Sequence, residues 1–153
     1  MEPSYIVLGA GVIGLSTALQ LKQQDPNCII TIVAKHFPGD QSIEYTSPWA
    51  GANWDSFAID NGRHQRWDAI TYRRLGELAD NTPESGVRRL ELRKFFDLPI
   101  EQAGVYSEGT KTIWYEELVG GLRPVPIGEL FEGVCFGFDY DSYVIDVAMY
   151  LPW

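Results

Sequence analysis

The sequence predicts an α/β protein that opens with a parallel βαβ unit and continues into strands of a mixed sheet. Three observations predict this fold class. The continuous apolar run Tyr5–Leu8 leads into a glycine-rich turn, a helical repeat follows the turn, and a second apolar run, Cys28–Ala34, follows the helix. Continuous apolar runs are typical of parallel strands that are buried on both faces. Strand, glycine turn, helix and strand within about thirty residues form a βαβ unit.

The glycine turn carries the spacing G-x-G-x-x-G, which is typical of a Rossmann-type dinucleotide site. Gly9 permits the sharp exit from the strand, Gly11 lets the backbone approach a pyrophosphate, and Gly14 lets the helix pack on the strand. The phosphates would lie at the amino end of a helix, where free N–H groups and the helix dipole favour an anion. The predicted cofactor-binding residues of this turn are Gly9, Ala10, Gly11, Val12, Ile13 and Gly14. The alternative is a tight βαβ turn that holds no nucleotide.

The helix after the turn has apolar residues at steps of three and four, and we expect them to face inward. They are Val12, Leu15, Ala18 and Leu19, with Lys22 one step later, and Asp25–Asn27 stops the helix. The second strand, expected to be buried, runs out into Ala34, Lys35 and His36. A site for NAD or FAD normally has Asp or Glu there, which accepts hydrogen bonds from ribose hydroxyls. Either Lys35 accommodates the 2′-phosphate of NADP, or other groups hold the ribose of FAD.

Composition sets limits on the class of protein. The 153 residues carry a formal charge of −9, 45% hydrophobic residues and 13% aromatic residues, which indicates a globular chain of about one domain. The negative charge disfavours nucleic acids and anionic membranes as partners. Cys28 and Cys135 are expected to be buried reduced thiols, and His36 and His64 have no ligand partners at metal-binding spacing. No apolar stretch approaches ~20 residues, and we expect neither a membrane span nor a secretory signal.

The remaining elements follow in order. A long polar loop occupies 35–54, and a helix is expected over Gly62–Ala79. Alternation over Val87–Phe96 predicts a strand whose solvated face carries Arg88, Arg89, Arg93 and Lys94. One or two short strands are expected around the Glu108 and Gly109 turn within 104–118, then a Pro-rich loop over 122–130, and paired strands or a hairpin within Gly133–Ile145. Asp146 is expected to cap a closing helix.

No third parallel apolar strand occurs, although a Rossmann sheet needs further strands beside the first two. The closing helix of about seven residues is also marginal by itself. We therefore expect the sequence to be the truncated first part of a larger protein.

A second motif, the segment Thr46–Trp54 with the sequence TSPWAGANW, alternates small residues with two tryptophans. Small residues let the backbone approach a flat aromatic ligand, which the indoles would shield from water. Together with Val7–Leu21 and Ser142–Trp153, this segment resembles the amino-terminal part of the FAD-dependent D-amino-acid oxidase family, particularly its fungal members. The resemblance spans the whole chain but less than half of a family member.

The resemblance implies FAD as the cofactor and assigns roles to residues. The glycine turn would hold the pyrophosphate, Gly51 and Asn53 would direct backbone N–H groups to the flavin, and Trp54 would help to enclose it. Lys35 stands where fungal members carry a basic residue, and Ser42 would reach the phosphates. The implied domains are an incomplete FAD-binding Rossmann part over 1–80, strands of the substrate domain over 81–145, and over 146–153 the start of a helix that returns to the FAD domain.

Family members transfer a hydride from the α-carbon of a D-amino acid to the flavin, and dioxygen reoxidises the flavin to give hydrogen peroxide. The implied products are a 2-oxo acid and ammonia, the implied location is peroxisomal with a cytoplasmic alternative, and a homodimer is compatible with the family. Catalytic residues are expected beyond residue 153, so none is assigned. Two alternatives stay open: a non-catalytic truncated remnant that binds FAD weakly or not at all, and an NADP-linked reductase.

Overall fold

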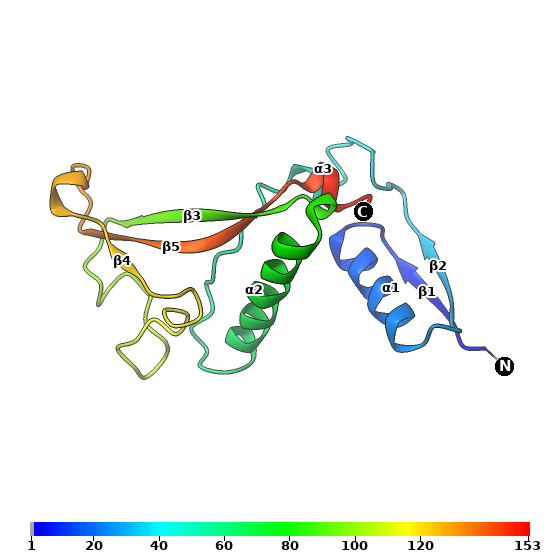
Figure 1. The fold of residues 1–153 in the computed structure, drawn as a ribbon, viewed down its shortest axis with the longest axis horizontal. Helices are drawn as coiled ribbons and strands as arrows, with labels where there is room; N and C mark the ends of the chain where they lie inside the picture. Colours follow the sequence, from blue (N-terminus) through cyan, green and yellow to red (C-terminus); the bar gives the residue numbers. More distant parts are fainter. Residues whose placement is uncertain (1) are drawn as a thin grey trace. The chain divides into compact units, whose positions relative to one another are not determined.

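The computed structural model describes residues 2–153 (Figure 1). Its strands are β1 (Ser4–Leu8), β2 (Ile29–Val33), β3 (Val87–Phe96), β4 (Arg123–Pro124) and β5 (Phe136–Ile145). Its α-helices are α1 (Val12–Gln24), α2 (Arg63–Asn81) and α3 (Val147–Tyr150), and short 3₁₀ helices occupy η1 (Ser47–Trp49), η2 (Pro83–Ser85) and η3 (Ile127–Glu129). The chain is therefore an α/β protein with parallel and antiparallel pairing, as predicted.

The chain divides into two compact units. The first unit extends to Ala52 and includes Glu84–Gly86 and Ile145–Trp153, and the second unit consists of Asn53–Pro83 and Val87–Val144. The sequence analysis divided the chain by function instead, into 1–80, 81–145 and 146–153. That division stays a prediction.

The first unit contains the expected parallel strand pair. β1 and β2 align with Ser4 opposite Ile29 and Leu8 opposite Val33, and α1 contacts both strands. The N–H of Asp25 bonds to the carbonyl of Leu21 and ends α1 at the predicted stop.

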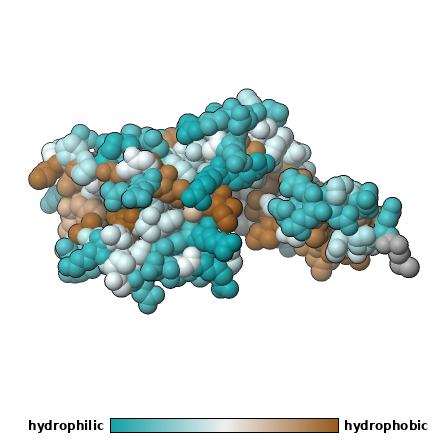
Figure 2. Space-filling view, turned by 60° about the horizontal axis from the view of Figure 1, so that its bottom comes forward, coloured by the Kyte–Doolittle hydropathy of each residue, from teal (hydrophilic) through white to brown (hydrophobic). Residues whose placement is uncertain are grey.

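The predicted burial of these strands is wrong for the described residues. In β1 only Val7 is buried, while Ile6 and Leu8 are 70% and 79% exposed, and β2 contains no buried residue. Of the α1 side chains that were expected to face inward, only Ala18 is buried. Apolar surface accordingly shows over the part of the first unit next to the amino terminus (Figure 2). The physical reason is that β1 and β2 pair only with each other within residues 2–153, and α1 is the main element that packs on them.

The second unit is built on a sheet in the order β3-β5-β4, against which α2 contacts β3. β4 is antiparallel to β5, with Pro124 opposite Phe138. Buried aromatic rings form the core. Trp54 packs edge-on against Tyr72 with ring centroids 4.7 Å apart, and Tyr72 packs in the same way against Tyr143 with centroids 4.9 Å apart. Edge-to-face pairs of this kind contribute more than their buried area alone.

Several local predictions are confirmed. β3 has the predicted bounds, and α2 starts after Gly62 as expected. The carboxylate of Asp146 accepts a hydrogen bond of 3.1 Å from the N–H of Ala148, so this residue caps α3.

Other predictions need correction. The segment 104–118 forms turns rather than strands, because Gly109 at φ +72° and the bond from Thr110 N–H to the Ser107 carbonyl reverse the chain tightly. Cys135 is exposed, whereas Cys28 is buried, and both are free thiols. Lys94 lies in a half-buried ion pair instead of on a solvated face.

Two features are absent from residues 2–153. No helix there is long and apolar enough for a membrane span. No group of three or more His, Cys, Asp or Glu side chains in that range is placed to hold a metal ion.

Candidate cofactor site

The glycine turn between β1 and α1 has the backbone geometry that its spacing predicts. Gly9 has φ +96°, in the left-handed region that favours glycine, and its N–H donates to the carbonyl of Val33 at 2.8 Å. A Cβ added to Gly14 would lie 2.0 Å from the carbonyl oxygen of Gly9. No side chain fits at Gly14, because the first turn of α1 packs directly on the exit from β1.

A serine from the loop after β2 lies over the amino end of α1. Gly11 is the N-cap of α1, and the N–H of Val12 donates to the hydroxyl of Ser47 at 3.1 Å. A Cβ added to Gly11 would lie 2.8 Å from the same hydroxyl oxygen. The lack of a side chain at Gly11 therefore permits Ser47 to reach the turn.

A tyrosine of the same loop fixes the other side of the turn. The hydroxyl of Tyr45 donates to the carbonyl of Ala10 at 2.6 Å, and both residues are buried. Burial raises the pKa of the Tyr45 hydroxyl, and the charge of Asp40 raises it further. Val12 and Ile13, in the first turn of α1, are exposed instead.

These features fit a diphosphate. The turn offers main chain without side chains at three positions, the first turn of α1 carries no acidic residue, and a serine hydroxyl stands at the helix terminus. Backbone N–H groups and the positive end of a helix dipole favour an anion at such a place. The Ser47 hydroxyl still has its own proton to donate after it accepts from Val12.

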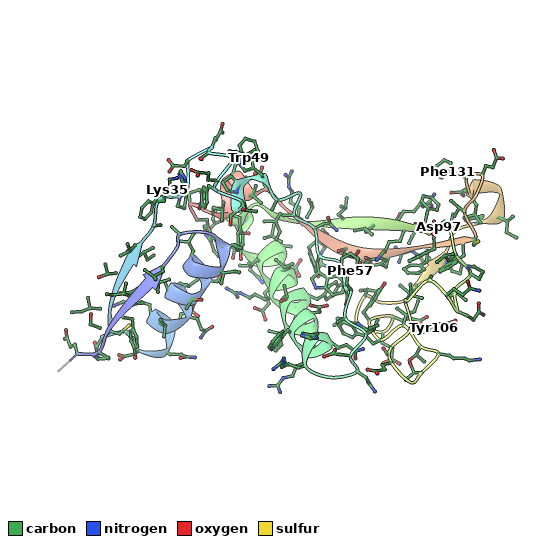
Figure 3. The ribbon with its side chains drawn as sticks, turned by 180° about the vertical axis from the view of Figure 1, so that it is seen from behind. Lys35, Trp49, Phe57, Asp97, Tyr106 and Phe131 are labelled. Atoms are coloured by element: carbon green, nitrogen blue, oxygen red, sulfur yellow. The ribbon has the colours of Figure 1, made fainter. Side chains whose placement is uncertain are left out.

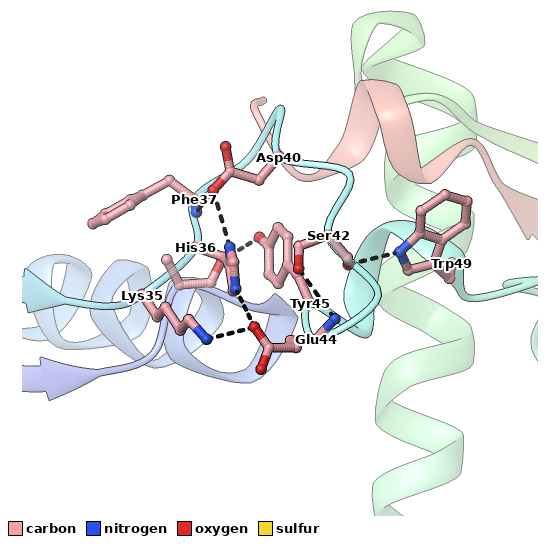
Figure 4. A network of polar contacts seen from close by, with 9 residues as sticks. Lys35, His36, Phe37, Asp40, Ser42, Glu44, Tyr45 and Trp49 are labelled. Atoms are coloured by element: carbon pink, nitrogen blue, oxygen red, sulfur yellow. Dashed lines mark hydrogen bonds and ion pairs between the residues drawn. The ribbon is translucent and has the colours of Figure 1, made fainter.

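A polar network follows the end of β2 (Figure 4). The ammonium of Lys35 pairs with the carboxylate of Glu44, and Nε2 of His36 lies 3.5 Å from the same carboxylate oxygen. Nδ1 of His36 lies 3.3 Å from the carboxylate of Asp40. The hydrogen bond from Lys35, followed by that from His36, lowers the pKa of Glu44. The positive charge of Lys35 is therefore matched by a carboxylate of the same loop.

Within residues 2–153, the hydrogen bonds of Ser42 join it to residues of its own loop and not to the glycine turn. Its hydroxyl accepts from the N–H of Glu44 at 3.2 Å, and its carbonyl accepts from the indole of Trp49 at 3.0 Å. Figure 3 shows Lys35 and Trp49 on this stretch of chain after β2. Ser47 is the serine whose hydroxyl bonds to the turn, and a contact of Ser42 with the phosphates stays a prediction. The sequence analysis did not assign Ser47 to the site, although Ser47 lies in the second motif, Thr46–Trp54.

The residues of that segment have different surroundings. Gly51 is exposed, and a Cβ added there would meet no atom within 4 Å. Asn53, in the second unit, forms an antiparallel bridge with Val144. The indole of Trp54 is 5% exposed and donates to the carbonyl of Asp68 at 3.1 Å. Trp54 thus belongs to the aromatic core of the second unit, and a flavin contact from its indole stays a prediction.

A half-buried charged cluster follows Trp54 in the second unit. The ammonium of Lys94 donates to both carboxylate oxygens of Asp55, at 2.9 and 2.8 Å, and the hydroxyl of Tyr140 donates to one of them at 2.7 Å. The side chains of Asp55 and Lys94 are only 14% and 18% exposed. Burial raises the pKa of Tyr140, and the hydrogen bond to Asp55 raises it further. The cluster joins the segment after Trp54 to β3 and β5.

Three further basic residues of β3 and β4 have acidic partners. Arg89 pairs with Asp80, and Arg93 with Asp139 and Glu129. Arg123 pairs with Glu91 and Asp141. No substrate-binding role is assigned to these three arginines.

Three of the curated proteins similar to the chain are oxidases by name. A D-amino-acid oxidase of Fusarium vanettenii is 35% identical over 159 residues, which cover 100% of this chain and 43% of that protein. A D-amino-acid oxidase of Schizosaccharomyces pombe is 35% identical over 148 residues, which cover 97% of this chain and 40% of that protein. A D-aspartate oxidase of Talaromyces thermophilus is 31% identical over 173 residues, which cover 100% of this chain and 46% of that protein.

The chain spans less than half the length of these relatives. No protein-family profile matches it. The predicted resemblance to the D-amino-acid oxidase family is confirmed over the whole chain.

Proposed function

We propose that this relative of the D-amino-acid oxidases is the FAD-binding part of an enzyme that oxidises D-amino acids to 2-oxo acids, with ammonia and hydrogen peroxide as the other products. The observation that carries the proposal is the glycine turn, in which Gly9 has a positive φ, Gly14 has no room for a side chain, and a Cβ at Gly11 would lie 2.8 Å from the hydroxyl of Ser47. The names of the relatives support the substrate class. Dioxygen is the proposed second substrate.

In this proposal the chain binds and orients the cofactor. The backbone from Gly9 to Ile13 and the hydroxyl of Ser47 hold the diphosphate, and the exposed residues Gly51 and Asn53 direct their backbone N–H groups to the flavin. When bound, FAD supplies the acceptor for the hydride that leaves the α-carbon of the substrate. Orientation and electrostatics are then the contribution of the protein. A peroxisomal location, with the cytoplasm as the alternative, and a homodimer are parts of the same proposal.

The reductase alternative is disfavoured by one contact. Lys35 could hold the 2′-phosphate of NADP only as a free cation, but its ammonium is paired with Glu44. A second carboxylate, Asp40, lies on the other side of His36. A phosphate dianion would meet two carboxylates beside these cations, and like charges repel. The site therefore favours an unphosphorylated ribose.

The remnant alternative concerns the given chain by itself, which spans less than half the length of each relative. It differs from the main proposal in its prediction for cofactor affinity. If the chain holds FAD by itself, it is a working binding part. A peroxide-coupled assay of the isolated chain with D-alanine or D-aspartate is expected to show no turnover, because the catalytic residues are proposed to lie outside it.

A titration tests the proposal. FAD and NADP are each added to the chain, with flavin fluorescence for FAD and calorimetry for NADP. We expect saturable binding of FAD at least ~10-fold tighter than that of NADP. Gly11→Val should abolish FAD binding, because a side chain then stands where the pyrophosphate must approach. Gly128→Val is the control, since a Cβ added at Gly128 meets no atom within 4 Å. Tighter binding of NADP, or unchanged FAD binding by the Gly11 variant, would contradict the proposal.

A further inference from the structure

We propose that Glu44 supplies, from the loop after β2, the carboxylate that a dinucleotide site needs at the end of its second strand, and that it accepts a hydrogen bond from a ribose hydroxyl of FAD. The inference rests on the proposed function and deepens it. It assigns to Glu44 the choice between an unphosphorylated and a 2′-phosphorylated ribose.

The need for such a residue follows from the strand itself. β2 ends at Val33 and continues into Ala34, Lys35 and His36, so no acid stands at the position that normally binds the ribose. A dinucleotide bound at the glycine turn would leave its ribose hydroxyls without an acceptor from the strand.

The contacts of Glu44 bring a carboxylate to that place. Its Oε2 atom pairs with Lys35 and lies 3.5 Å from Nε2 of His36, and these two residues directly follow the end of β2. The side chain of Glu44 is 61% exposed. Within residues 2–153, its other oxygen, Oε1, has no partner, because every contact of the carboxylate is made by Oε2. One acceptor oxygen is thus available in an ionised group.

The loop also links Glu44 to the glycine turn. The N–H of Glu44 bonds to Ser42, and the next residue, Tyr45, donates to the carbonyl of Ala10 within the turn. The ring of His36 stacks on Tyr45 with centroids 6.1 Å apart. These contacts tie the position of the carboxylate to the segment that holds the diphosphate, as an acceptor for the adjoining ribose requires.

The same pair sets the specificity. With Glu44 ionised, the Lys35–Glu44 pair has no net charge to offer to a 2′-phosphate, and the carboxylate repels the phosphate. If Glu44 loses its charge, Lys35 becomes a free cation at the end of β2. One substitution should therefore weaken the binding of FAD and strengthen that of NADP.

The test measures the dissociation constants of FAD and NADP for the unsubstituted chain, for Glu44→Gln and for Asp40→Asn. Asp40→Asn is the matched control, because it removes one carboxylate of the same loop that contacts the other nitrogen of His36. We expect Glu44→Gln to weaken the binding of FAD by about tenfold, which is the scale of a hydrogen bond to a charged group. The same variant should bind NADP more tightly than the unsubstituted chain does. Asp40→Asn should leave the dissociation constant of FAD within about twofold of the original value.

If the unsubstituted chain binds FAD, any of three results would overturn the inference. Glu44→Gln could keep its FAD affinity within twofold, or Asp40→Asn could lose as much FAD affinity as Glu44→Gln does. Glu44→Gln could also weaken the binding of FAD and of NADP in parallel, which would indicate a collapsed loop. If the unsubstituted chain binds no FAD, the proposed function fails and the inference falls with it. The two failures are therefore distinguishable in one set of titrations.

Discussion

Replacement of Gly11 by alanine tests how the loop after β2 is fastened to the glycine turn. The added Cβ would lie 2.8 Å from the hydroxyl oxygen of Ser47, which is too close for both atoms to stay. The hydroxyl is the end of a short side chain and can turn away, so the substitution should break its hydrogen bond with the N–H of Val12. Loss of such a helix-capping bond costs about 1 kcal/mol.

The magnitude can be separated with a double-mutant cycle. Ser47→Ala removes the same hydrogen bond and should lower the free energy of unfolding by about 1 kcal/mol. In that background Gly11→Ala meets no oxygen, since the next atoms, on Tyr45 and the Cβ of Ser47, lie 3.8 and 3.9 Å away. At a φ of −78° alanine is unstrained, and the substitution should stabilise by roughly 0.4–1 kcal/mol through the unfolded chain.

Urea unfolding of the four proteins measures the cycle. We expect Gly11→Ala to be neutral or destabilising in the original chain and stabilising in the Ser47→Ala chain, with a coupling energy of about 1 kcal/mol. Gly51→Ala is the control, because its added Cβ has no neighbour within 4 Å. Strict additivity of Gly11→Ala and Ser47→Ala would refute the contact between Ser47 and the turn.

The second unit gives two more predictions. Lys94→Met should lower the free energy of unfolding by about 3 kcal/mol, because it leaves the carboxylate of Asp55 half-buried without its cation. Urea unfolding measures this loss, with Lys111→Met, at an exposed position, as the control. Equal losses of stability in the two variants would contradict the prediction. Arg93 lowers the pKa of Asp139, so the unfolded chain binds more protons and stability falls as the pH drops from about 5 through the folded-state value. Asp139→Asn should therefore show a shallower loss of stability between about pH 5 and 2 in thermal melts, and an unchanged slope would exclude Asp139 as a source of that loss.

Elements with strong local patterns were predictable from the sequence. Alternation located β3 to the residue, and the glycine spacing located the turn between β1 and α1. Asp146 was recognised as a cap because a short acceptor side chain before a helix satisfies its first N–H groups. These features depend on residues close in sequence, which is why a pattern reveals them.

Features that depend on distant residues were not predictable. Lys94 reads as one of four solvated basic residues until the chain brings Asp55 to it. Burial of β1 was inferred from its apolar run, but burial needs neighbouring strands, which residues 2–153 do not provide. Ser47 and Glu44 reach the turn and the end of β2 only through the path of an irregular loop. No periodicity in the sequence records such a path.

Crystals of the chain grown with FAD would test the central claim most directly. We predict electron density for a diphosphate over the main chain of Gly9–Gly11, within hydrogen-bond distance of backbone N–H groups at the amino end of α1 and of the Ser47 hydroxyl. Density for FAD elsewhere, with the amino end of α1 still satisfied by Ser47 alone, would contradict the account.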